Sequence, residues 1–395
     1  MFGQCRSTDI VVANAHSNFL QPINGQRADD PQTPHRIFNR IRAILLPCVV
    51  RAFGLHVDST DSMREEAHFS NLIAGIENVD TIGSTALMRA ARRGAVGDLD
   101  YLVELGADIN HVNDDGDTAL IWAAMNGRLD AVRSSVALGA NIDHANQYGD
   151  TALTLAAIHG HLDVVNRLVE LGANIDHVNN LDNTALTMAA RYGKFDVMNR
   201  LAELGATVER VDGAGRTTLM QAVEWGKLDA LNELVGLGLN VNGCGERGNT
   251  ALISAASRGR VEAVSRLIEL GADINQGDSN GDTALSLIVA FSPFARVGFR
   301  PLEASGFTAL EMVTRLVELG ANVNHVNNHG NTVLIEAVQC RALDMVNHLI
   351  ALGANIHHVN NEGNTALSLA AHLGDVDVTY ALLRADPTVN GALRQ

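Results

Sequence analysis

The chain has 395 residues and a formal net charge of −16 at pH 7, with 46% hydrophobic but only 4% aromatic residues. This composition is too apolar for a disordered chain and too polar for a membrane protein. The acidic balance, with lysine only at Lys194 and Lys227, excludes nucleic acid as a partner, because binding to phosphate backbones needs clustered Lys and Arg. Four cysteines lie far apart, without metal-site spacing, so we expect a reducing, cytoplasmic location.

The first 78 residues lack the regularity of the rest of the chain. Residues 1–34 are polar and aperiodic, which predicts disorder. Residues 35–55 carry four arginines among apolar residues and no acidic residue, which predicts a basic amphipathic helix interrupted at Pro47. Within a helical segment 35–78, this helix has three open interpretations: a cap on the first repeat, a membrane-surface or targeting helix, or a docking helix for a partner.

From about residue 79 to the C-terminus the sequence is repetitive. The triplet Thr-Ala-Leu at Thr85 recurs, with variants, at intervals of 33 residues, and one interval of 49 residues contains an insertion. The recurring threonines are Thr85, Thr118, Thr151, Thr184, Thr217, Thr250, Thr283, Thr332 and Thr365. The array 79–395 therefore has nine units, and the seventh unit carries the insertion, at about residues 291–307.

Each unit predicts two short helices followed by an extended turn. In the third unit, Thr151 is placed to cap the first helix, and Gly160 to end it in the left-handed conformation. Asp163 lies near the start of the second helix, where a carboxylate offsets the helix dipole, and Gly172 closes that helix. One such unit cannot bury its own apolar face, so we expect the units to stack into an elongated, curved solenoid.

This 33-residue pattern, with Thr-Ala-Leu-x-x-Ala-Ala in the first helix and Leu-Gly-Ala after the second, resembles the ankyrin repeat family over roughly four fifths of the chain. The resemblance implies an all-α repeat fold, an ankyrin-type solenoid of helix–turn–helix units with β-hairpin-like loops. The chain departs from the family pattern where alanine replaces the usual proline, as at Ala86 and Ala152, and no unit keeps the motif histidine. Asp182 replaces a hairpin glycine, so an atypical turn is expected there.

The resemblance also implies a protein partner on the concave side, at the hairpin tips and the first-helix surface. Aromatic residues and arginine are the types enriched at binding hot spots. The candidate partner-binding residues are Tyr148, His159, Arg191, Tyr192, Arg216, Trp225, Arg247, Arg258 and Phe291. An alternative is that Tyr192 and Trp225 only pack on neighbouring units, and we expect Trp122 in the core.

The insertion is rich in phenylalanine. Four of the ten phenylalanines of the chain lie in it. Long loops within compact repeats are often functional. Either the rings fold back on the neighbouring repeat as a small satellite core, or some of them are presented to a partner.

Five histidines occupy one hairpin position in different units: His111, His144, His177, His325 and His358. Neighbouring units stack about 10 Å apart, whereas zinc needs ligand nitrogens near 2.0–2.1 Å, so we expect a solvated or hairpin-packing role and no metal. The chain has no nucleophile elbow, phosphate-binding loop or His-Glu-x-x-His motif. We therefore expect no catalytic residues, no cofactor and no enzymatic activity.

Three functional hypotheses follow. The first is a monomeric, non-enzymatic scaffold or adaptor that binds a protein partner on its concave surface, centred on units three to seven. The second is a membrane- or host-targeted regulatory protein, localised by its N-terminal basic helix, with membrane contact only through residues 35–55. The third is a purely structural spacer.

Overall fold

The computed structural model describes residues 79–291 and 308–386. The predictions of disorder for 1–34, of a capping or targeting helix within 35–78, and of packing or binding by the insertion lie outside the described residues. The units are numbered 1 to 9 by their threonines, from Thr85 to Thr365, and each unit includes the hairpin that precedes its threonine.

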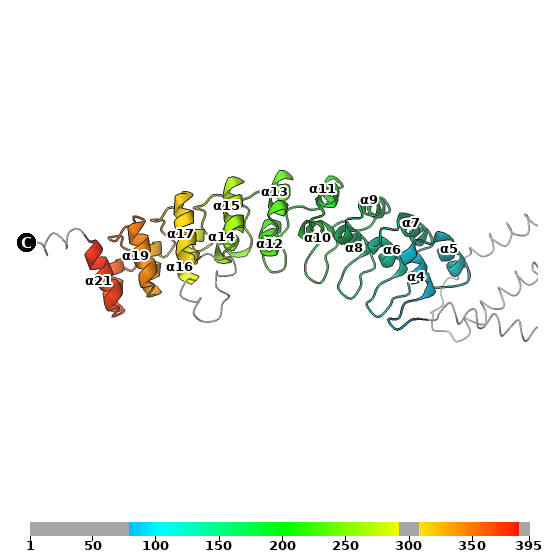
Figure 1. Ribbon diagram of the computed structural model, residues 1–395, viewed down its shortest axis with the longest axis horizontal. Coiled ribbons are helices and arrows are strands. Elements are labelled where there is room, and N and C mark those ends of the chain that lie inside the picture. The colour runs from blue at the N-terminus through cyan, green and yellow to red at the C-terminus, as the bar shows by residue number, and fades with distance from the viewer. Residues whose placement is uncertain (1–78, 292–307, 387–395) are drawn as a thin grey trace, which may run out of the picture.

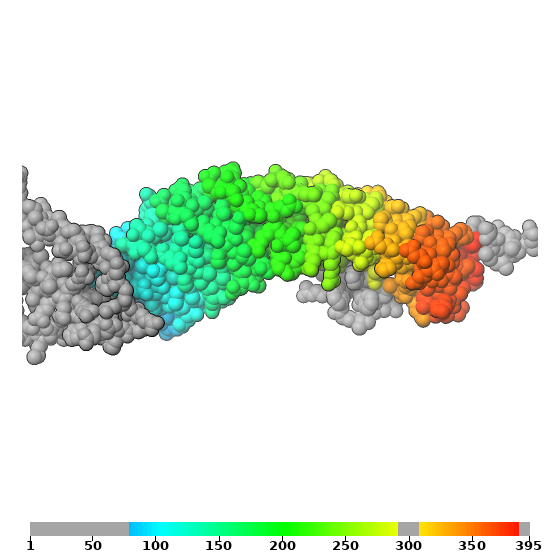
Figure 2. Space-filling view, turned by 180° about the vertical axis from the view of Figure 1, so that it is seen from behind, coloured from blue at the N-terminus to red at the C-terminus, as the bar shows by residue number. Residues whose placement is uncertain are grey.

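The described chain is a row of helix pairs joined by hairpin loops, and it forms an elongated, curved body (Figures 1 and 2). The first helices of units 1 to 9 are α4 (Ala86–Arg93), α6 (Ala119–Met125), α8 (Ala152–His159), α10 (Ala185–Arg191), α12 (Thr218–Trp225), α14 (Ala251–Ser257), α16 (Ala284–Phe291), α18 (Val333–Gln339) and α20 (Ala366–His372). The second helices are α5 (Val96–Glu104), α7 (Leu129–Ala137), α9 (Leu162–Glu170), α11 (Phe195–Glu203), α13 (Leu228–Gly236), α15 (Val261–Glu269), α17 (Ala309–Glu318), α19 (Leu343–Ala351) and α21 (Val376–Ala385). The first helices and hairpins lie on the inner side of the curve.

The helix boundaries follow from the residues at each end. The hydroxyl of Thr151 accepts a hydrogen bond of 3.3 Å from the backbone N–H of Thr154, which caps α8. Gly160 ends α8 with φ 80°, a conformation that costs glycine no steric strain. Asp163 lies in the first turn of α9. The predicted helix–turn–helix unit is thereby confirmed.

The core runs along the whole stack between the two rows of helices. Leu153, Ala156 and Ala157 of α8 are buried, as are Val165 and Leu168 of α9. The small alanines let neighbouring helices approach closely, which explains the scarcity of aromatic side chains. Trp122 is only 6% exposed, as predicted. Among the described residues there are no strands, only isolated antiparallel bridges such as Val211 with Thr217, so the all-α solenoid fold is confirmed.

The recurring histidines join one unit to the next. Nε2 of His144 donates to the carbonyl of Gly116 at 2.9 Å, in the hairpin of the preceding unit. The same bond recurs, at 2.8–3.1 Å, from His111 to Gly83, His177 to Gly149, His325 to Gly281, and His358 to Gly330. We call this series the His ladder. The histidines therefore have a specific inter-unit role, beyond the hairpin packing that the sequence predicted.

Two further series of hydrogen bonds run parallel to the His ladder. In the Asn ladder, a hairpin asparagine amide donates to the side chain before the threonine of the preceding unit, as from Asn179 to Asp150 at 2.8 Å. In the backbone ladder, a hairpin N–H donates to the preceding hairpin, as from Asn180 to the carbonyl of Tyr148 at 3.1 Å. Together the three ladders satisfy polar groups that stacking would otherwise bury unpaired.

The His ladder predicts a stability effect. His144→Ala removes the donor to Gly116, so we expect a loss of about 1 kcal/mol in the free energy of unfolding, measured by urea denaturation. The control is His372→Ala, an exposed histidine at the end of α20. Equal stabilities of the two variants would contradict a stabilising ladder.

Candidate functional site

A cleft of about 610 Å³ opens on the inner side of the curve, in units 5 to 7. It lies between the hairpins and the first helices, and we call it the central cleft. Its walls include Arg216, Arg247 and Arg258, three of the residues predicted to bind a partner. The structure thus brings together predicted residues that are far apart in the sequence.

The central cleft lies where the ladders lack side chains. Gly243 stands at the position of the ladder histidine in unit 6, and Gln276 stands there in unit 7. Gly245 replaces the ladder asparagine, and a Cβ atom at this residue would lie 2.1 Å from the carbonyl oxygen of Gly215. Only glycine allows so close an approach. The His and Asn side chains that bridge neighbouring hairpins elsewhere are therefore missing here, although Gln276 donates to the carbonyl of Asn242 at 3.3 Å, and the cleft lies open between the hairpins.

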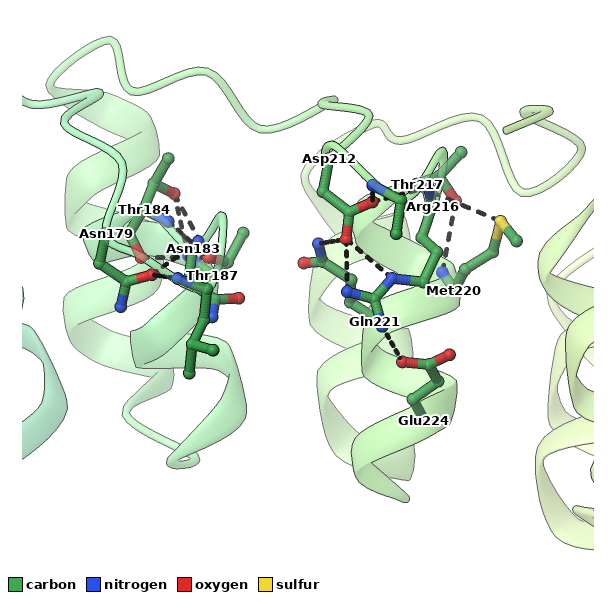
Figure 3. A network of polar contacts seen from close by, with 12 residues as sticks. Asn179, Asn183, Thr184, Thr187, Asp212, Arg216, Thr217, Met220, Gln221 and Glu224 are labelled. Carbon is green, nitrogen blue, oxygen red and sulfur yellow. Dashed lines mark hydrogen bonds and ion pairs between the residues drawn. The ribbon is translucent and has the colours of Figure 1, made fainter. Parts of the chain in front are cut away.

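Arg216 is held in the wall of the cleft by two carboxylates (Figure 3). Its Nε and Nη2 atoms lie 2.8 and 2.7 Å from Asp212, and its Nη1 atom lies 2.6 Å from Glu224. Burial by itself raises the pKa of Asp212, but hydrogen bonds from the backbone and guanidinium of Arg216 bring that pKa below its usual value. These two ion pairs therefore hold the Arg216 side chain in one position in the wall of the central cleft.

Arg258 continues this network into unit 6. It forms an ion pair with Glu224 and donates to the hydroxyl of Ser254 at 2.6 Å. Glu224 thus holds one arginine from its own unit and one from the next. The repeat pattern alone gave Glu224 no role; the available signal was an acidic residue 34 residues before an arginine on the same face.

Arg247 is the cleft arginine whose guanidinium forms no hydrogen bond or ion pair with another described residue. It lies in the 3-10 turn η1 (Glu246–Gly248) at the tip of the hairpin, exposed, with φ 60°. A non-glycine residue in this left-handed region is strained, and such strain is often found at functional sites. Its side chain is therefore available to a partner.

The other predicted residues are spread along the inner face. Tyr148, at the hairpin tip of unit 3, is 59% exposed, and Tyr192, which follows α10, is 50% exposed. His159 stacks on His161 with ring centroids 6.1 Å apart, and burial, followed by the charges of His161 and Lys194, lowers its pKa. No contact within the described residues joins these three side chains to one another. The side chain of Phe291, the last residue of α16, lies outside the described residues.

Arg191 and Trp225 are brought together across two units. The guanidinium carbon of Arg191 in unit 4 lies 5.7 Å from the ring centroid of Trp225 in unit 5, the geometry of a cation–π contact. The ring is half-buried and packs against the core. Trp225 therefore joins its unit to the preceding one, whereas Tyr192, which the alternative interpretation grouped with it, is exposed.

A group of carboxyls borders the cleft at unit 7. Nδ2 of Asn327 donates to both Asp282 Oδ1 and Glu336 Oε1, at 2.8 Å each. The Glu336 Oε2 atom is buried without a hydrogen-bond partner among the described residues. Burial, followed by the charge of Asp282, raises the pKa of Glu336 to about 8. Glu336 therefore carries a proton at neutral pH, a feature that the sequence analysis missed.

The described ranges 79–291 and 308–386 contain no group of three or more His, Cys, Asp or Glu side chains arranged to hold a metal ion. None of the helices in these ranges combines the length and apolarity that crossing a bilayer requires.

Glu336 predicts a pH-dependent stability. The pKa of Glu336 is about 8 in the folded chain and near 4.5 when unperturbed. Its contribution to the free energy of unfolding is therefore complete below about pH 4.5 and is lost as the pH rises through about 8. Glu336→Gln stays neutral, so at about pH 9 we expect it to exceed the wild type by on the order of 2 kcal/mol in urea denaturation. The exposed control Glu104→Gln should follow the wild type. A constant difference between Glu336→Gln and wild type across this range would contradict the assignment.

Comparisons with known proteins agree with this architecture. A family model of ankyrin repeats (three copies) matches residues 64–143, 87–179, 135–212, 172–243, 219–293 and 302–391. No curated protein matches the chain. Two similar solved structures are the human ASB11 ankyrin repeat domain (25% identity, 52% of this chain and 91% of that chain, TM-score 0.45) and the ankyrin repeat domain of Bcl-3, a member of the IkappaB protein family (30% identity, 52% and 93%, TM-score 0.47). The chain belongs to the ankyrin repeat family, whose repeats are protein–protein interaction modules.

Proposed function

We propose that this protein is a non-enzymatic scaffold or adaptor that binds a protein partner on its concave surface, with the central cleft as the main site. The observation that supports this most is the convergence of Arg216, Arg247 and Arg258 in a cleft that the missing ladder side chains leave open. Two of these arginines are fixed by Glu224, whereas Arg247 is free to reach a partner.

The lining of the central cleft suits a protein segment. Met220, Ile253 and Leu287 supply apolar surface. Carboxylates of Asp278 and Asp282 and the guanidinium of Arg247 supply charges of both signs. A nucleic acid would require an excess of positive charge, which this lining lacks. An extended loop with polar and apolar side chains matches the lining, because interfaces combine an apolar centre with a polar rim.

The exposed tyrosines extend the proposed surface toward the N-terminal units. Tyr148 and Tyr192 project from units 3 and 4, on the hairpin and first-helix side of the array. Tyrosine supplies contact area and a hydrogen-bonding hydroxyl at low entropic cost, which is why it is frequent in binding surfaces. In this proposal they form a second contact region beside the central cleft.

Two other expectations remain part of the proposal. A cytoplasmic location is supported by Cys244 and Cys340, which are free thiols in the described part of the chain. A monomer is supported by stacking that buries the core within one chain, so that no second copy is needed to complete it.

The central cleft can be tested with matched arginine variants. We expect Arg247→Ala to reduce recovery of the partner about fivefold or more, because truncation of a hot-spot arginine costs over about 1 kcal/mol. The measurement is affinity purification of the full chain from its native source, quantified by mass spectrometry. Arg133→Ala, on the exposed surface of α7, is the control.

The two variants separate the alternatives. Both should retain the circular dichroism spectrum and melting temperature of the wild type, because both side chains are exposed. Equal recovery of the partner with Arg247→Ala and wild type would exclude the central cleft as the main site. Loss of recovery with Arg133→Ala alone would instead place the partner on the second-helix side.

A further inference from the structure

Within the described residues, the junction between units 4 and 5 is the one that lacks all three ladders. Arg210 occupies the position of the ladder histidine, and Asp182 occupies that of the glycine whose carbonyl the histidine would contact. Asp212 occupies the position of the ladder asparagine, and a carboxylate cannot donate to Asn183. Figure 3 shows the networks around Asn179 and around Asp212 side by side, with no interaction drawn between them.

The backbone ladder is interrupted at the same junction. On the N-terminal side, Asn180 donates to Tyr148 at 3.1 Å; on the C-terminal side, Ser279 donates to Arg247 at 2.8 Å. Between them, the N–H of Gly213 forms no such bond with the carbonyl of Leu181. The junctions that border the central cleft keep a backbone bond, so the loss of all three ladders distinguishes the 4/5 junction.

A side chain also lies between the hairpins at this junction. Asp182 adopts φ 60°, the conformation of the glycine it replaces. Its carboxylate lies against Gly213, where a Cβ atom would be 2.7 Å from Oδ2. The side chain of Asp182 thus lies between the hairpins of units 4 and 5, whereas the hairpins of the neighbouring junctions are joined directly by hydrogen bonds.

Other contacts remain across the junction, among them a hydrogen bond of 3.3 Å from Nδ2 of Asn199 in α11 to Glu233 in α13. Thr207 donates to Asp176 from its backbone and its hydroxyl, at 2.8 Å each, as the backbone of Asn174 donates to Asp143 in the preceding unit, and Arg191 covers Trp225. Among the described first helices, α10 and α12 pack less closely than any other neighbouring pair. Both the missing hairpin bonds and the looser packing of α10 on α12 reduce the interactions that couple units 4 and 5.

We propose that the 4/5 junction is an articulation that divides the array into two cooperative blocks, units 1–4 and units 5–9. In a linear array each unit is stabilised by its neighbours only, so one weak interface uncouples the two sides. The blocks unfold separately and change their mutual angle, while each remains rigid. The inner face from Tyr148 to Arg258 spans this articulation, so its curvature is set at the junction.

The two tryptophans of the chain allow a direct test of uncoupling, because Trp122 lies in unit 2 and Trp225 in unit 5. Trp122→Phe leaves fluorescence from the second block, and the difference from the wild type, which keeps the same Arg191–Trp225 contact, gives the signal of the first block. Into each background we introduce Val165→Ala in unit 3 or Val264→Ala in unit 6, two fully buried valines at the same position of their units. The urea midpoint of each tryptophan is then measured.

We expect Val165→Ala to lower the midpoint of the Trp122 signal and leave that of Trp225 unchanged, and Val264→Ala to do the reverse. Asp182→Gly with Arg210→His restores the His–Gly pair, and in that background each valine variant should lower both midpoints. If each valine variant lowers both midpoints equally without the repair, the proposal of two blocks is overturned.

Bending is measured separately in the folded protein, by pulsed electron–electron double resonance, which gives the distribution of distances between two spin labels. Nitroxide labels replace Glu203 and Glu269, which lie across the junction, or Glu104 and Glu170, which lie within the first block; all four exposed glutamates occupy the same position of their units. The four native cysteines are replaced by serine. We expect a wider distance distribution across the junction, which narrows with Asp182→Gly and Arg210→His. Equal widths for the two pairs would overturn the articulation.

Discussion

The interface between neighbouring units carries the stability of this protein, because no unit can bury its own apolar face. Each helix pair exposes Leu, Ala and Val on both flanks, and only the next pair covers them. Apolar burial is not directional, so it favours stacking without fixing the exact distance between hairpins. The three ladders supply the directional part, since a hydrogen bond such as that of His144 to Gly116 forms only in one register.

Because apolar burial favours stacking and the ladders fix the register of the hairpins, an interruption of the ladders changes an interface even where the stack of helices continues. Where Gly243 and Gly245 remove ladder side chains, the backbone bond remains and the central cleft opens between hairpins. Where Asp182, Arg210 and Asp212 replace ladder residues together, the backbone bond is lost as well. The same apolar stack thus yields rigid, open or loosely coupled interfaces, depending on a few polar positions in the hairpins.

The sequence predicted the fold well because helix caps, apolar spacing and turn glycines are local features repeated many times. It also predicted the hairpin position of the histidines and the burial of Trp122. The sequence could not reveal the hydrogen-bond partners of these histidines, because His144 and Gly116 are 28 residues apart and come into contact only when two units stack. The same holds for Glu224, which meets Arg258 across a unit boundary, and for Glu336, whose raised pKa arises from burial beside a carboxyl of another unit.

The pair Arg191 and Trp225 shows how a surface pattern acquires a structural role. A row of arginines and aromatic residues on the inner face predicts partner contacts, because these types dominate binding hot spots. Here the guanidinium lies over the indole at the one junction that lacks all three ladders, so the pair supplies some of the coupling that hydrogen bonds supply elsewhere. A partner that draws Arg191 away from Trp225 would weaken the same junction.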